Sequence, residues 1–130
     1  MSAIQLLAAV ALLAGTAPAA AQSMSPMRGE ITSFTDAFAV RVHPANPYDH
    51  RIRVDVRVYD QEFRPVAAQV LPGSFTLGAQ ASRSVLVVVP FEGAASRKVR
   101  ICTESVPFPD NQTQIRAQIC GKFLATRQSR

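Results

Sequence analysis

Hydrophobic and polar residues alternate along several short stretches of this 130-residue chain. The clearest is Arg51–Tyr59, where a β-branched residue occupies every second position and mostly charged residues lie between them. Successive side chains of a β-strand point to opposite faces, so the pattern predicts a strand with one face on a core. The inward residues are Ile52, Val54, Val56 and Val58, and the outward residues are Arg51, Arg53, Asp55 and Arg57. The charged face is either simply solvated or a surface for an acidic partner.

Other short stretches predict further strands, and proline and glycine fall between them rather than within them. The expected strands are Ala37–His43, Ala67–Leu71, Ser74–Leu77, Ser82–Val89, Lys98–Glu104 and about Gln112–Ala125, with a weaker first strand at Met27–Ile31. No helical period occurs beyond the first residues. About seven short strands separated by turns predict an all-β protein, a seven-stranded antiparallel sandwich of immunoglobulin type. A small barrel is the structural alternative.

The run Val85–Val89 is apolar at every position and therefore cannot be amphipathic. Either both of its faces are covered within the fold, or one face is exposed for a partner. In the second case, the run would be an interface for a homo-oligomer.

The N-terminal residues resemble an export signal. Leu6–Ala14 is uninterruptedly apolar, Gly15 and Pro18 follow, and Ala19–Ala21 supplies the small residues that signal peptidase accepts. We therefore expect a signal peptide at 1–21, cleavage after Ala21, and one domain at 22–130 in the periplasm or outside the cell. The apolar run is too short for a transmembrane anchor, so we expect no membrane insertion after signal removal.

Charge and motifs narrow the function. The net charge of +5 comes from basic residues spread along the strands, which favours solubility over nucleic-acid binding. His43 and His50 lie in or beside a turn region without further ligands, so we expect no metal site and no cofactor. The sequence contains no nucleophile motif and no phosphate-binding loop, so we do not expect an enzyme.

Two cysteines in an exported chain suggest a disulfide. If the last two strands form a hairpin with Cys102 opposite Cys120, both cysteines fall on the polar face and the apolar residues gather on the other. That register also places Arg100 opposite Lys122. The two long side chains either splay into solvent or converge on an anion, most simply a carboxylate.

Four segments together resemble the N-terminal immunoglobulin-like domain of periplasmic pilus-assembly chaperones of the chaperone–usher pathway. Asn46-Pro47-Tyr48 is similar to the turn into the family's third strand. The segments Val70–Leu77 and Ser105-Val106-Pro107 are similar to its V-x-P-x-x-F-x-L and I-P segments. Ile119–Arg127 is similar to the I-x-x-K-L-F-Y-R ending of its last strand.

The resemblance implies roles for individual residues. Lys122 matches the lysine that binds the C-terminal carboxylate of a pilin subunit, and Arg28 matches the arginine that joins it. Three residues, Ile115, Ala117 and Ile119, match the alternating hydrophobic residues that complete the subunit's unfinished fold; the alternative is that Ile115 and Ile119 belong to the core. A branch of the family also has a disulfide between the same two strands. The family's second sandwich domain has no counterpart expected within 22–130.

These observations lead to two functional hypotheses. The first is a periplasmic chaperone-like protein that binds secreted or pilin-type subunits or peptides by β-strand addition. The alternative is a non-enzymatic structural or surface-assembly sandwich that associates through Val85–Val89.

Overall fold

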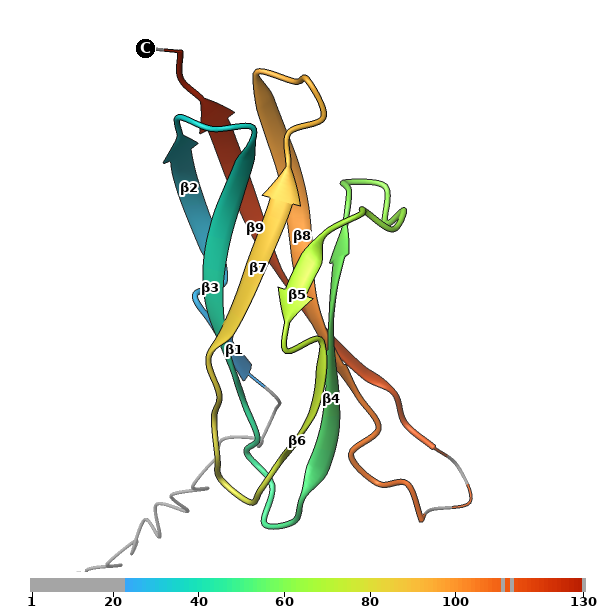
Figure 1. Cartoon of the computed structure of the whole chain (residues 1–130). Helices are drawn as coiled ribbons and strands as arrows, with labels where there is room; N and C mark the ends of the chain where they lie inside the picture. Colours follow the sequence, from blue (N-terminus) through green and yellow to red (C-terminus); the bar gives the residue numbers. More distant parts are fainter. Residues whose placement is uncertain (1–22, 111, 113, 130) are drawn as a thin grey trace, which may run out of the picture.

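The computed structural model describes residues 23–110, 112 and 114–129, so the expected signal peptide at 1–21 lies outside the described residues. The described residues form two β-sheets packed face to face, and none of them forms a helix long and apolar enough to cross a membrane. In Figure 1 the sheet containing β3, β7 and β5 lies in front of the sheet containing β9 and β8. The all-β immunoglobulin-like sandwich predicted from the sequence is confirmed.

The first sheet has the strand order β1-β3-β7-β5, and the second has the order β2-β9-β8-β4-β6. The strands are β1 Ser23–Ser25, β2 Arg28–Ser33, β3 Ala37–Ala45, β4 Ile52–Tyr59, β5 Gln69–Leu71, β6 Ser74–Leu77, β7 Val85–Pro90, β8 Ser96–Ser105 and β9 Ala117–Arg127. The described residues thus form nine strands rather than seven, and the second sheet is mixed because β2 runs parallel to β9. The last strand begins at Ala117, five residues later than expected from the sequence.

The core lies between the sheets and is made of the inward residues of the alternating stretches. All four inward residues of β4, from Ile52 to Val58, are buried, as the pattern predicted. In β7, Val85, Val87 and Val89 are fully buried, whereas Leu86 and Val88 face outward and are only partly covered. The apolar run therefore has one core face and one partly exposed face.

The N-terminal segment crosses from one sheet to the other at Pro26, between β1 on the first sheet and β2 on the second. Gly121 of β9 lies beneath this crossover. A Cβ atom at Gly121 would stand 2.8 Å from the Phe123 ring, 3.0 Å from the Met27 carbonyl oxygen and 3.1 Å from the Met24 side chain. Glycine thus permits the close approach that lets β2 begin beside Lys122.

Candidate functional site

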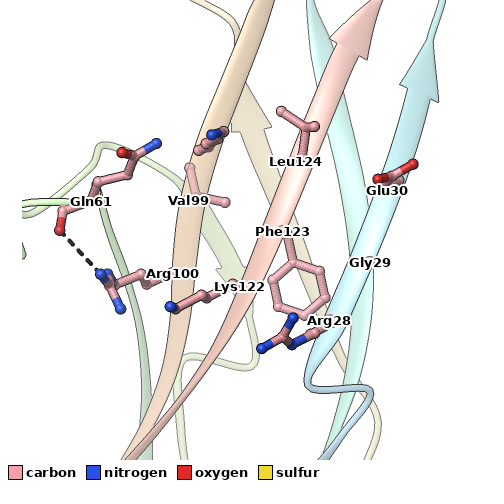
Figure 2. A pocket seen from close by; sticks show the side chains of 10 residues that line it. Arg28, Gly29, Glu30, Gln61, Val99, Arg100, Lys122, Phe123 and Leu124 are labelled. Carbon is pink, nitrogen blue, oxygen red and sulfur yellow. Dashed lines mark hydrogen bonds between the residues drawn. The ribbon is translucent and has the colours of Figure 1, made fainter.

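Three basic residues lie side by side across three neighbouring strands. Arg28 of β2 is the register partner of Lys122 of β9, and Lys122 is the register partner of Arg100 of β8. Figure 2 shows the three side chains following one another across the sheet, with Lys122 between the two arginines. The predicted pairing of Arg100 with Lys122 is therefore confirmed, and we call these three residues the cationic row.

The cationic row lines a surface cavity of about 510 Å³. Its other lining residues include Lys98 and Glu30, so that four basic residues and one acidic residue surround it. The backbone amide of Lys122 donates a 2.9 Å hydrogen bond to the carbonyl oxygen of Met27, which fixes the start of β2 against β9. Among the described residues, no carboxylate lies within 4.0 Å of Arg28, Lys122 or Arg100 in an ion pair.

Arg100 is the most constrained member of the cationic row. Its guanidinium carbon lies 4.3 Å from the centre of the Phe63 ring, and its Nη2 donates a 3.3 Å hydrogen bond to the carbonyl oxygen of Gln61. Its Nε is buried and has no hydrogen-bond partner in the described part of the chain. A cation held over an aromatic face is attracted by the ring quadrupole, so Phe63 holds this arginine in place.

A tight turn presents Phe63 to Arg100. One Asp60 carboxylate oxygen accepts hydrogen bonds from the backbone amides of Glu62 and Arg64, both at 2.9 Å. The Arg64 backbone hydrogen bond is the largest cause that lowers the pKa of Asp60 below that of a free aspartate. Phe63 has a φ of 59°, a region that bulky residues rarely occupy, and its side chain is 47% exposed. Phe63 was not among the site residues predicted from the sequence; an aromatic residue within a mostly polar segment between two strands was the available signal.

The disulfide lies beside the cationic row, two residues further along β8 and two residues earlier along β9. Cys102 and Cys120 are bonded as predicted, with Cα atoms 4.0 Å apart, and they point to the same face as Arg100 and Lys122. A disulfide is consistent with an oxidising compartment outside the cytoplasm. It also ties β8 to β9 beside the cationic row.

The carboxylate on the far side of the disulfide is already engaged. Glu104 accepts hydrogen bonds from the Tyr59 hydroxyl at 2.6 Å and from Gln118 Nε2 at 2.9 Å, and its other oxygen lies 3.3 Å from Arg57 Nε. Its hydrogen bond, together with burial, raises the pKa of Tyr59 above that of a free tyrosine. Glu104 therefore has partners of its own and is not a counter-ion for the cationic row.

One edge of β9 is open where the cationic row begins. The β2–β9 ladder starts at Arg28 and Lys122, and no described strand pairs with that side of Ala117–Gly121. Gly121 itself is buried beneath the crossover, so we call Ala117–Cys120 the open edge. Such an edge carries unpaired N–H and C=O groups that can template another strand.

The three proposed strand-donor residues lie along or next to the open edge. Ala117 and Ile119 are partly buried in β9, whereas Ile115 precedes the strand and is 58% exposed. The buried hydrophobic cluster takes Phe123 and Ala125 from β9 but none of these three. Their apolar surface is therefore partly available to a partner.

His50 has a structural role. His50 Nε2 donates a 2.5 Å hydrogen bond to the Pro107 carbonyl oxygen, and its ring packs with Tyr48 and Phe108. This cluster anchors the β8–β9 connection to the turn before β4. Across residues 23–110, 112 and 114–129, no group of three or more potential ligands could hold a metal ion.

The two stacked sheets define the class of fold as an immunoglobulin-like sandwich. No family model matches the sequence, and no curated protein shows significant similarity to it. Among solved structures, the chain is similar to the Salmonella enterica SafA pilin–SafB chaperone complex, with a TM-score of 0.68 and 19% identity over 83% of this chain and 55% of that one. It is also similar to the E. coli chaperone DraB, with a TM-score of 0.69 and 18% identity over 84% of this chain and 56% of that one.

The chain therefore has the fold of the N-terminal immunoglobulin-like domain of chaperone–usher periplasmic chaperones, and it spans little more than half the length of these two matches. The same fold is found in SSP-19, an MSP-domain-like protein of Caenorhabditis elegans, with a TM-score of 0.59 and 10% identity over 80% of this chain and 98% of that one. At these sequence identities the comparisons show the fold only. Any inference about function has to come from the geometry of the candidate site.

Proposed function

We propose that this protein is a periplasmic or secreted chaperone-like protein that binds an extended segment of a pilin-type subunit or another secreted protein by β-strand addition. The observation that carries the proposal is the meeting of the open edge with the cationic row. The edge offers backbone hydrogen bonds along Ala117–Cys120, and it ends next to Arg28 and Lys122.

The positive charges of Arg28 and Lys122 favour one direction of the bound strand over the other. A segment that runs parallel to β9 brings its C-terminus to Arg28 and Lys122, whose side chains can hold the terminal carboxylate. An antiparallel segment would bring its positively charged N-terminus to the same place, which like-charge repulsion disfavours. In the parallel arrangement the bound segment would also lie in line with β2, along the same side of β9 and in the same direction, because β2 itself runs parallel to β9.

Side chains of the bound segment would contact the apolar residues that the core leaves partly exposed. Ile119 and Ala117 lie on the inward face of β9, so a partner with an unfilled hydrophobic groove can cover them. Ile115 adds the largest exposed apolar side chain at the beginning of this path. Burying such a side chain contributes about 1.5–3 kcal/mol to association.

Co-expression with candidate pilin-type subunits tests this proposal. We expect Lys122→Ala to lower the recovered complex about tenfold, as loss of a charge-assisted hydrogen bond requires. We expect Ile119→Asp to abolish recovery. Two matched controls, Arg41→Ala and Leu71→Asp, change exposed residues of the other sheet and should leave recovery unchanged. Equal recovery with the wild type and both site variants would contradict the proposal.

The alternative, a structural or surface-assembly protein, is supported by one observation. Leu86 and Val88 face outward on β7, and Leu71 of β5, the register partner of Leu86, is 51% exposed. Light scattering coupled to size-exclusion chromatography separates the two functions. A stable oligomer that Val88→Lys dissociates would favour assembly, whereas a monomer would favour the chaperone-like function.

A further inference from the structure

We propose that Arg100 forms a second anion-binding position, so that the site prefers partners whose C-terminal residue is aspartate or glutamate. This inference rests on the proposed function, because it assumes that a terminal carboxylate occupies the position of Arg28 and Lys122. The second carboxylate, from the terminal side chain, would then bind between Lys122 and Arg100.

The charge around the cavity supports two carboxylates rather than one. Its four basic and one acidic lining residues leave a surplus of three positive charges. A single carboxylate would leave most of this surplus uncompensated. Glu104 and Asp60, which lie on elements next to the cavity, are held by their own partners and cannot supply the missing charge.

The spacing also fits a dicarboxylate. Neighbouring strands lie about 5 Å apart, so Arg28 and Arg100 flank Lys122 on opposite sides at roughly 10 Å from each other. Arg100 is bonded to Gln61, on the side away from Arg28, as Figure 2 shows. One carboxylate therefore cannot be shared by all three cations, whereas the two carboxylates of a C-terminal acidic residue can occupy the two gaps.

The turn after β4 is organised to hold Arg100. Phe63 occupies a left-handed backbone conformation and leaves about half of its ring in solvent, both of which are unfavourable for phenylalanine. The ring makes two contacts in return: the Arg100 guanidinium lies 4.3 Å from its centre, and the Tyr59 ring centre lies 6.2 Å away. Among the described residues the guanidinium donates one hydrogen bond, from Nη2 to Gln61, so its other terminal N–H groups remain available to a ligand.

Fluorescence anisotropy with four labelled peptides tests the inference. Each peptide alternates valine and threonine, ends in glutamine or glutamate, and carries either a free C-terminal carboxylate or an amide. With the wild type, we expect the free-acid glutamate peptide to bind about five- to tenfold more tightly than the free-acid glutamine peptide. With Arg100→Gln, this preference should disappear while the affinity for the glutamine free acid stays within about twofold.

Two further variants separate charge from folding. Arg100→Lys keeps the charge and should retain part of the glutamate preference. Phe63→Ala keeps Arg100 but removes its support, and should reduce the preference without affecting the glutamine free acid. Circular dichroism during heating establishes that each variant is folded.

The outcomes distinguish the two proposals. If free acids bind no better than amides, or if no peptide binds, the proposed function fails and this inference fails with it. If free acids bind better than amides but glutamate offers no advantage, or if its advantage persists in Arg100→Gln, only the second anion-binding position is overturned.

Discussion

Replacing Lys122 with alanine should stabilise the folded protein while it weakens partner binding about tenfold. Lys122 lies between two arginines and has no carboxylate partner among the described residues. A residue that serves only the fold would not be placed there, because like charges directly across a ladder are destabilising. A gain in stability on its removal would mean that the fold does not need Lys122, which fits a role in binding.

The magnitude follows from the register. Two unit charges at the strand spacing of about 5 Å, with an effective dielectric constant of about 40–80, repel by about 0.8–1.7 kcal/mol. Lys122 has two such neighbours, although flexible side chains splay apart and salt screens part of the effect. After subtraction of the packing lost with the lysine stem, we expect a net stabilisation of about 0.5–1 kcal/mol at low ionic strength.

Urea denaturation at low and high ionic strength measures this effect. The gain should disappear in about 1 M salt, where the Debye length falls to about 3 Å. Arg28→Ala removes one neighbouring repulsion rather than two and should gain about half as much. Arg41→Ala, on the other sheet, breaks a hydrogen bond to Ser84 and should be neutral or slightly destabilising. A Lys122→Ala protein that is less stable than the wild type at low salt would refute the reasoning.

Three other perturbations have defined outcomes. Replacing Cys102 and Cys120 by alanine opens a loop with a sequence separation of 18 residues, and urea denaturation should show a loss of about 3 kcal/mol in the chain-entropy model; a loss below about 1 kcal/mol would mean that the β8–β9 ladder alone suffices. Gly121→Ala introduces a Cβ into the crossover and should cost about 1–3 kcal/mol, whereas unchanged thermal unfolding would contradict the close packing. The pKa of Tyr59 is raised above its ordinary value of 10.0, so its hydrogen bond to Glu104 contributes its full stabilisation below pH 10. This stabilisation is lost as the pH rises through the folded-state pKa. Melting temperatures measured from about pH 9 upwards should therefore fall in the wild type by an amount that Tyr59→Phe does not show.

Local alternation was sufficient to predict which residues form the core. Strand side chains have a period of two, so the inward valines of β4 could be identified without knowledge of the strand's partners. The same property placed Cys102 opposite Cys120 and Arg100 opposite Lys122, because one register satisfied both the cysteines and the apolar residues. For the same reason, the sequence predicted two of the three members of the cationic row as neighbours.

The parallel pairing of β2 with β9 depended on residues distant in sequence. The family resemblance had implied a role for Arg28, but the alternation of Met27–Ile31 was too weak to place it. Its position is set by the crossover at Pro26, which requires the absence of a side chain at Gly121 on the other end of the chain. The pattern of residues within a single strand cannot predict such a contact.

The sequence by itself determined the fold class, the core faces and the disulfide, because each depends on periodicity or on a single pair of residues. Only the tertiary structure decided that β2 begins at Arg28, which leaves the open edge of β9, and that Ile115 precedes β9 in an exposed position. It alone also placed Phe63 against Arg100. These features arise where separate segments meet, and their geometry is set by packing between segments that the alternation within any one strand does not encode.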